Sequence, residues 1–238
     1  MKNNIKYKAA TLDERKEYYE KEFSITKAKQ WFKKNNMNLP QLCALDAGSD
    51  TGIILNKKWK DKMFYFEFKD LKKKIQKYNP EDIYYDRNVY DNPKKVLDTL
   101  KFDKRIKQEL TFDIDADNIK CSYSKPVCDK CLSKAYDFAI NMKKELKKSG
   151  FKKIRLVYSG RGFHLHILDK KAYFLSIKER DLLNKRFNKY PIDPWVSKGN
   201  IRLIRLPYSM NGLVSRIATP VEKIYKKEKT IPKFLKLS

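Results

Sequence analysis

Apolar side chains recur along the chain at two periods, roughly every 3.6 residues in some segments and every second residue in others. The longer period predicts amphipathic helices, such as the stripe of Ala135, Ala139, Met142 and Leu146 that ends at Gly150. The predicted helices cover residues 11–23, 24–35, 68–78, 135–150 and 177–188.

The shorter period predicts strands bounded by turn residues. These strands cover residues 51–55, 63–68, 109–115, 154–158, 163–167, 201–206 and 213–219. Residues 39–52 contain one Pro and two Gly and are expected to form turns. Because strands and helices are interleaved, the predicted fold class is α/β or α+β, in one domain over residues 1–238.

The net charge of the chain indicates what kind of partner it binds. The 238 residues include 55 Lys and Arg against 29 Asp and Glu, which gives a net charge of +26. Such an excess repels itself in the folded state and favours a polyanionic partner, above all nucleic acid. The alternative explanation is a lysine-rich composition of the kind that thermophiles use.

The N-terminus has no apolar run, and no stretch approaches the roughly 18 apolar residues of a membrane span. We therefore expect a soluble, cytoplasmic protein without a membrane partner. Residues 222–238 are rich in Lys, and this basic C-terminal tail is expected either to follow a nucleic-acid backbone or to lie free in solvent.

The strand predicted at residues 109–115 ends in acidic side chains, with Asp113 and Asp115 two positions apart. Alternate residues of a strand point to one face, so these carboxylates share a face, roughly 6–7 Å apart at the backbone. Such a pair repels unless a cation lies between, which favours Mg²⁺ and two-metal phosphoryl transfer. An EF-hand is excluded, because Asn118 and Ser124 occupy its Gly and Glu positions. The alternative is a surface strand with solvated acids.

Two further predicted strands are joined by Ser159–His164, of sequence SGRGFH. Its glycines allow a ligand to approach the backbone closely, and Ser159, Arg161 and His164 can contact a triphosphate. His166 is expected on the same strand face as His164. The segment is not a Walker loop, because it lacks G-K-[ST] and no helix follows. The alternative is a tight hairpin with a structural histidine.

Three of the four cysteines lie within eleven residues, which favours a metal knuckle over a disulfide framework. Structural Zn²⁺ requires four ligands. The fourth ligand is open between Cys43, Asp129 and another local oxygen, and three reduced, buried cysteines are the alternative. The three predicted zinc ligands are Cys121, Cys128 and Cys131.

Together, the acidic strand and the SGRGFH segment resemble the archaeo-eukaryotic primase family, in particular the catalytic small subunit of DNA primase in a compact archaeal-type version. That family has a D-x-D strand, an S-G-x-x-G-x-H segment, and then a third Asp followed by a basic strand. Asp193 and Arg205 match the third element, within residues 192–209. The resemblance covers residues 18–221 and includes residues 64–68 and 80–85.

The resemblance implies the primase catalytic fold, with mixed or antiparallel sheets flanked by helices and a zinc knuckle inserted at residues 118–133. It implies that Asp113, Asp115 and Asp193 are catalytic and hold Mg²⁺ or Mn²⁺. The residues that it implies for nucleotide binding are Ser159, Arg161, His164, Arg205 and Asn211.

The chain departs from the family pattern at three places. The second motif is one residue short, with five steps from Ser159 to His164. Asn211 stands where the family often has His, and it can form hydrogen bonds but carries no charge. Only 26 residues separate His166 from Asp193, where many members carry a helical subdomain.

The function implied is that of a primase: synthesis of short RNA or DNA primers from NTPs or dNTPs on a single-stranded DNA template, beside a primase large subunit. A repair or plasmid-type primase-polymerase is the alternative within the superfamily. A two-metal nuclease would use similar acids but needs no triphosphate clamp. A non-catalytic module that binds single-stranded nucleic acid would keep the charge without needing the three aspartates.

Overall fold

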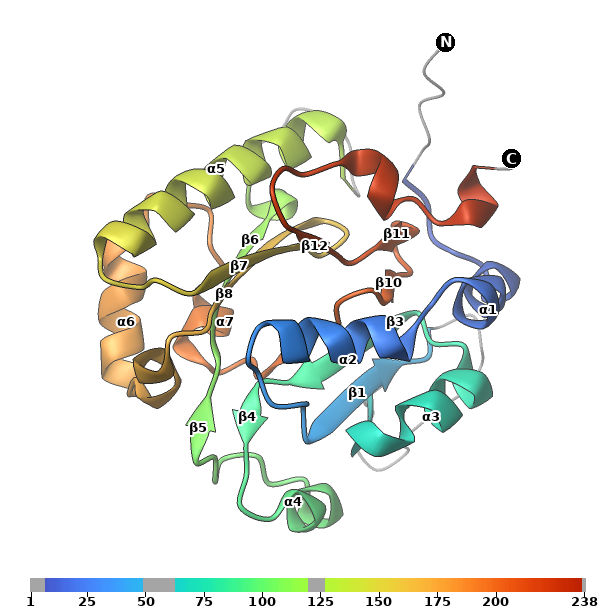
Figure 1. Ribbon diagram of the computed structural model, residues 1–238, viewed down its shortest axis with the longest axis horizontal. Helices are drawn as coiled ribbons and strands as arrows, with labels where there is room; N and C mark the ends of the chain where they lie inside the picture. Colours follow the sequence, from blue (N-terminus) through green and yellow to red (C-terminus); the bar gives the residue numbers. More distant parts are fainter. Residues whose placement is uncertain (1–6, 49–62, 120–126, 237–238) are drawn as a thin grey trace.

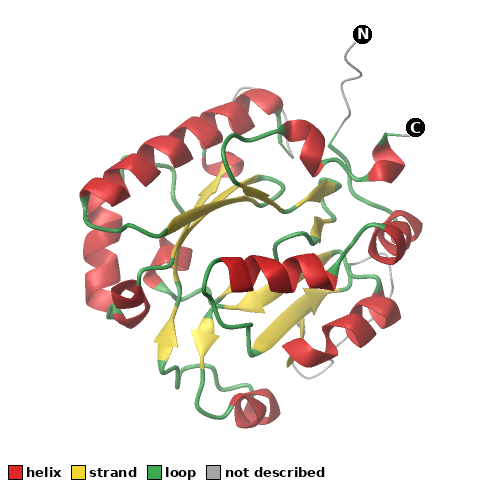
Figure 2. Ribbon diagram, in the orientation of Figure 1, coloured by secondary structure: helices red, strands yellow, loops and turns green. Residues whose placement is uncertain are grey.

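Two antiparallel sheets share a core in the computed structural model, which describes residues 7–48, 63–119 and 127–236 (Figures 1 and 2). The strand expected at residues 51–55 and the zinc-ligand candidate Cys121 lie outside the described residues. The mixed α/β class and the antiparallel pairing expected from the sequence are both confirmed.

The predicted helices form close to their expected bounds because their capping residues are in place. Thr11 accepts a hydrogen bond from the Glu14 N–H and Glu14 returns one, which completes a capping box. Ser24 caps the second helix in the same way, through the Lys27 N–H. The helices are α1 (Leu12–Lys21), α2 (Ile25–Lys34), α3 (Leu71–Tyr78), α4 (Pro93–Thr99), α5 (Asp129–Lys148), α6 (Ile177–Arg186) and α7 (Pro194–Lys198).

The larger sheet has six strands in the order β11-β10-β3-β1-β2, with β9 also paired to β3. Its strands are β1 (Leu42–Asp46), β2 (Met63–Glu67), β3 (Asp82–Asp86), β9 (Leu203–Arg205), β10 (Met210–Asn211) and β11 (Arg216–Ile217). The expectation of turns throughout residues 39–52 was wrong, because β1 lies there, between β2 and β3. Leu42–Leu45 is buried on both faces and therefore shows no apolar–polar alternation.

The smaller sheet has four strands in the order β12-β7-β8-β6. They are β6 (Leu110–Asp115), β7 (Ile154–Tyr158), β8 (Gly162–Ile167) and β12 (Thr219–Val221). Leu110, Phe112 and Ile114 point to the face that α5 covers, which Figure 1 shows on the outside of this sheet. Their neighbours in the strand, Asp113 among them, point to the other face. The strands β4 (Asn88–Val89) and β5 (Lys107–Gln108) form a separate two-stranded sheet, next in the chain to β3 and β6.

The strand predicted at residues 213–219 is in fact two strands that belong to different sheets. Arg216–Ile217 pairs with β10, whereas Thr219–Val221 pairs with β7. The chain reverses before them, at Ser215 with φ of +50°. It then crosses at Ala218, whose N–H and C=O bond to Ser209 and Tyr208. This crossover joins the last strand of one sheet to the edge of the other.

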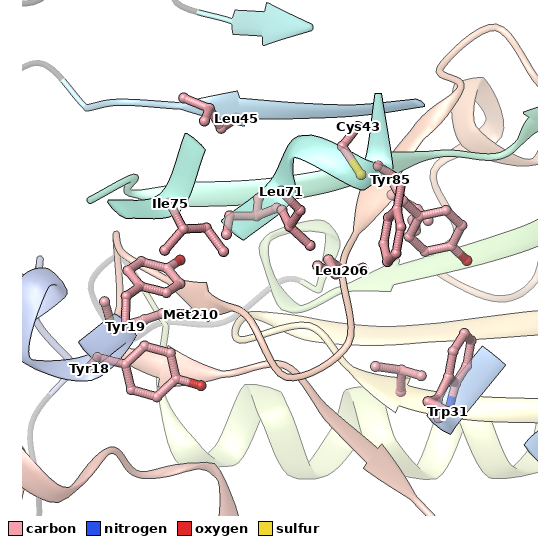
Figure 3. Close-up of a cluster of buried hydrophobic side chains, with 14 of the residues drawn as sticks. Tyr18, Tyr19, Trp31, Cys43, Leu45, Leu71, Ile75, Tyr85, Leu206 and Met210 are labelled. Atoms are coloured by element: carbon pink, nitrogen blue, oxygen red, sulfur yellow. The ribbon is translucent and has the colours of Figure 1, made fainter. Parts of the chain in front are cut away.

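Helix α2 lies between the sheets and fills the core that they share. Trp31 and Phe32 are buried there (Figure 3 labels Trp31). Trp31 packs edge-on against His166 of the smaller sheet, and Phe32 packs against Tyr85 of the larger one. The helix therefore fixes the spacing of the two sheets along one side of the core.

Residues 222–236 pack onto the body of the protein and do not form a solvated tail. Phe234 and Leu235 are buried in the shared core, and the Lys233 N–H donates to the Glu22 carboxylate at 2.7 Å. Within the described part of the chain, no helix is both long enough and apolar enough to cross a membrane.

Candidate active site

The two acids of the predicted motif stand at the end of β6, on the face turned away from α5. Asp113 pairs in register with His164 of β8, and Asp115 pairs with Gly162. The Asp113 and Asp115 side chains are 19% and 21% exposed, so they are neither sealed in the core nor open to bulk solvent. This partial burial makes any unneutralised charge on them costly.

The third acid arrives from a distant segment by a backbone contact. Ile192 forms an isolated β-bridge with Ile114, and the Asp193 N–H donates to the Asp113 carbonyl at 2.8 Å. The Asp193 carboxylate accepts a hydrogen bond from the Trp195 N–H at 2.8 Å and so caps α7. The fold thus brings Asp193 beside Asp113 and Asp115, as the three-motif arrangement requires.

Burial and the repulsion among these acids both disfavour their charged forms. Burial, followed by the charges of Asp115 and Asp193, raises the pKa of Asp113 well above its usual range. Burial also raises the pKa of Asp115, which the guanidinium of Arg161 opposes. Oδ1 of Asp113 is buried and has no hydrogen-bond partner among the described residues. The site therefore has an excess of negative charge that a cation would neutralise.

The carboxylates do not yet converge on one point. Within residues 7–48, 63–119 and 127–236, no three His, Cys, Asp or Glu side chains are close enough to form a ready metal site. The reason lies in their present partners, because Asp115 pairs with Arg161 at 3.2 Å and Asp193 caps a helix.

The Ser159–His164 segment forms a tight turn against the acidic strand. The Ser159 N–H donates to the Gly162 carbonyl at 2.9 Å, and the Gly162 N–H donates to Oγ of Ser159 at 3.1 Å. Gly160 has φ of +106°, and a Cβ at Gly162 would lie 2.2 Å from the Ile114 carbonyl oxygen. Glycine is therefore required at both positions, one for conformation and one for space.

Two polar side chains of the turn face the acids directly. Arg161 forms ion pairs with Asp115 at 3.2 Å and Asp117 at 3.1 Å, and its side chain is 33% exposed. Nε2 of His164 lies 3.5 Å from Oδ1 of Asp113, beyond a good hydrogen bond. Burial, with the nearby charge of His166, lowers the pKa of His164 well below its usual range.

The last two nucleotide-binding candidates lie at the same place but are engaged with the protein. Arg205 forms a two-pronged ion pair with Asp82 and a hydrogen bond to the Met210 carbonyl, and its side chain is 9% exposed. Nδ2 of Asn211 donates to the Ser159 carbonyl at 3.2 Å, which ties β10 to the turn. Oδ1 of Asn211 is buried and has no partner among the described residues.

His166 belongs to a buried network that sequence reasoning missed. Nδ1 of His166 lies 2.6 Å from Oε1 of Glu109, whose other oxygen accepts the Tyr85 hydroxyl proton at 2.9 Å. The histidine is fully buried and lies two positions further from the turn than His164. The sequence contains one clue to this network, because Glu109 is four residues before Asp113 and so points to the same strand face.

Two of the three predicted zinc ligands, Cys128 and Cys131, lie in the described part of the chain. Sγ of Cys128 caps α5 and lies 3.1 Å from Sγ of Cys131. Cys43 is buried on β1 in the shared core, away from Cys131 in the core under α5, so it is not the fourth ligand. Asp129 is already bound by the Tyr7 hydroxyl and by Lys227. The described residues therefore provide no zinc site.

Comparison with known proteins identifies relatives of this chain. A family model described as DNA primase small subunit matches residues 112–191, which include Asp113, Asp115 and the turn. An Archaeoglobus fulgidus protein, described as an uncharacterized DNA primase small subunit-like protein, is 35% identical. That match covers 89% of this chain and 84% of the relative.

Two longer relatives are also similar to this chain. The DNA primase small subunit PriS of Thermococcus sibiricus is 32% identical over 74% of this chain, and that of Pyrococcus furiosus is 31% identical over 72%. The chain spans only about half the length of these two relatives, at 48% and 47%.

A solved structure is also similar over most of the chain. It is the polymerase domain from Mycobacterium tuberculosis Ligase D in complex with DNA, with a TM-score of 0.48 and 13% identity. The match covers 90% of this chain and 81% of the solved chain. The family assignment depends on the sequence relatives instead. The strongest support is the Archaeoglobus fulgidus protein, whose match covers 89% of this chain and 84% of the relative. The chain belongs to the DNA primase small subunit family.

Proposed function

We propose that this family member joins nucleoside triphosphates on a single-stranded DNA template, as the catalytic subunit of a DNA primase. The observation that supports this most is the backbone bond between Asp193 and Asp113, which assembles three acids beside a glycine-rich turn. A primase large subunit is the proposed protein partner, in keeping with the small-subunit family.

Divalent cations fit the acids on physical grounds. The unpartnered Oδ1 of Asp113 and its raised pKa indicate a place where positive charge is missing. Asp113, Asp115 and Asp193 would hold Mg²⁺ or Mn²⁺, because carboxylates are the ligands that these ions prefer. When bound, such ions lower the pKa of an attacking 3′-hydroxyl and neutralise charge on the triphosphate.

The protein's own residues would orient the nucleotide. Arg161 is partly exposed and can exchange Asp117 for a phosphate oxygen, to which it forms charge-assisted hydrogen bonds. Ser159 and the neutral His164 add hydrogen bonds without charge. Arg205, held by Asp82, adds its positive charge to the potential at Asp113 and Asp115. Positioning of this kind accounts for most of the catalysis in phosphoryl transfer.

The test is incorporation of labelled ribo- and deoxyribonucleotides on an unprimed and a primed single-stranded template. Asp113→Asn combined with Asp115→Asn should remove incorporation on both templates. The double variant Asp98→Asn and Asp137→Asn, which changes the same charge at exposed positions on α4 and α5, should extend normally. Normal extension by the first variant would overturn the proposal. If the wild-type protein extended primed templates but started no chains on unprimed ones, its activity would be that of a gap-filling polymerase.

A structural zinc ion at Cys121, Cys128 and Cys131 remains a separate proposal, supported by their spacing and by the short Cys128–Cys131 distance. Elemental analysis of the purified chain should then find about one zinc per molecule, and a chelator should lower the melting temperature. If elemental analysis found no zinc and a chelator left the melting temperature unchanged, the zinc proposal would be wrong.

A further inference from the structure

A broad groove runs between α2 and the β7–β12 edge of the smaller sheet, with a volume of about 980 Å³. Figure 1 shows α2 facing β12 at this place. The groove receives cations from four separate segments: α2, α5, β7 and the chain after β12. These side chains are Lys27, Lys33, Lys34, Lys143, Arg155 and Lys223.

The positive charge of this basic groove is largely unneutralised. Among the described residues that line it, Glu222 is the single acid, and it pairs with Lys34 at 2.6 Å. Arg155 is held by Oδ1 of Asn35, a neutral amide that brings no negative charge. Burial, followed by the charges of Lys147 and Arg155, lowers the pKa of Lys143. These cations therefore repel one another, and an anionic ligand would relieve that repulsion.

Arg155 lies on the sheet face that carries the candidate active site, whereas Lys143 of α5 reaches the basic groove from the opposite face. Arg155 pairs with His166, and the next cross-strand row on that face pairs Val157 with His164 and His164 with Asp113. The groove thus occupies the β7–β12 side of the face, whereas the acids occupy the β6 side. Only β8 lies between β7 and β6, so two to three strand spacings separate the groove from the acids, which is roughly 10–15 Å.

We propose that the basic groove binds the sugar-phosphate backbone of a single-stranded nucleic acid. Cations on both walls suit a ligand that carries one negative charge at every repeat, and Tyr208 at the rim offers an aromatic ring for a base. The choice of nucleic acid over an acidic protein rests on the proposed function, whereas the place of binding rests on the groove alone.

The test is binding of a fluorescein-labelled oligo(dT) to the full chain, followed by anisotropy over a series of salt concentrations. The groove variant is Lys27→Gln, Lys33→Gln and Lys223→Gln, all exposed and outside the catalytic machinery. Each lost phosphate contact should reduce the salt slope by about 0.7, so three should reduce it by about 2. Affinity at about 0.1 M salt should fall roughly tenfold or more.

The matched control removes three exposed lysines from α3, as Lys72→Gln, Lys73→Gln and Lys77→Gln, and should keep the wild-type slope. The groove variant should also raise the KM for template while kcat at saturating template stays within about twofold. An unchanged slope in the groove variant, or an equal loss in the control, would overturn the inference. The inference would also be overturned if an acidic peptide bound the groove as tightly as the oligonucleotide does.

These outcomes are separable from those of the proposed function. The Asp113→Asn and Asp115→Asn variant should still bind oligo(dT) with the wild-type salt slope, although it cannot extend it. If that variant extended primers normally, the catalytic proposal would fail and the groove could still be a nucleic-acid site. If the groove variant bound normally while wild-type protein extended primers, only the inference about the groove would fail.

Discussion

At the scale of single residues, Asp113 is the side chain whose environment most clearly calls for a ligand. It is flanked by two other acids, and burial raises its pKa well above the usual range. Asp113→Asn should remove a repulsion and stabilise the metal-free protein by about 1 kcal/mol, or about 2–4 °C in melting temperature for a chain of this size.

The same substitution should also abolish stabilisation by Mg²⁺ or Mn²⁺. Thermal unfolding with and without the ion measures both effects, with Asp137→Asn as the control that keeps the wild-type response. A variant that is still stabilised by the ion as strongly as the wild type would show that Asp113 is not a ligand.

Glu109 gives a pH dependence with a definite sign. Burial alone would raise the pKa of this carboxyl, but the charge and hydrogen bond of His166 lower it. A depressed folded-state pKa contributes stability above the unfolded value, near pH 4, and that stability is lost as the pH falls through the folded value. Glu109→Gln should therefore cost about 3 kcal/mol at neutral pH and flatten the acid limb of the unfolding curve.

Chemical denaturation between about pH 2 and 7 tests this expectation, because the free energy of unfolding can be compared at each pH. Glu17→Gln, in an exposed pair with Lys21, should leave the curve unchanged. If Glu109→Gln kept the wild-type pH profile, the carboxyl would not be ionised in the folded state.

Sequence reasoning reached the acids and the turn because each motif is local, with strand alternation fixing which side chains share a face. It did not reach the partners of His166 and Arg205. Glu109 contacts His166 across paired strands, and Asp82 contacts Arg205 from a strand more than a hundred residues earlier. Such contacts depend on strand order, and no periodicity in a single segment encodes that order.

At the scale of elements, Gly162 keeps β8 in register with β6. Its missing side chain leaves room for the Ile114 carbonyl, which a Cβ would approach to 2.2 Å. Gly162→Ala should therefore separate the strands at Asp115, cost roughly 2–4 kcal/mol and strongly reduce nucleotide incorporation.

Gly150→Ala is the comparison, since φ there is +87° but the nearest atom to a Cβ is a lysine tip at 3.5 Å. It should cost only about 1 kcal/mol, the conformational part alone, and leave incorporation intact. Thermal unfolding and the incorporation assay separate the two variants, and equal effects would show that the close approach at Gly162 does not matter.

The five longer helices were the most predictable elements, because amphipathic stripes and caps both mark them, whereas the short α4 and α7 were not predicted. β1 escaped prediction because it is buried on both faces, and the strand predicted at 213–219 proved to be β11 and β12 because a crossover is not visible as a change of period. In both cases the deciding information was the neighbouring strand.

At the scale of the whole molecule, the C-terminal segment is structural as well as basic. Ile231, Phe234 and Leu235 are buried in the shared core, next to the N-terminal helices. Ending the chain after Val221 should therefore lower stability by several kcal/mol, because each buried apolar side chain contributes about 1.5–3 kcal/mol.

Melting temperature and limited proteolysis measure this loss. The variant Lys233→Gln and Lys236→Gln removes charge but keeps the apolar side chains, so it should melt like the wild type. A truncated chain that melted with the wild type would mean that the segment contributes charge and no packing.

The peptide bond between Ile192 and Asp193 gives the site a property that side chains alone could not provide. Its N–H is held by the Asp113 carbonyl, so the third acid is anchored by a group that every amino acid except proline supplies. A longer connection between Ile167 and Ile192 would therefore leave Asp193 in place relative to β6. An inserted domain at that point would leave the spacing of the three acids untouched, whereas Asp193→Pro would remove the anchor.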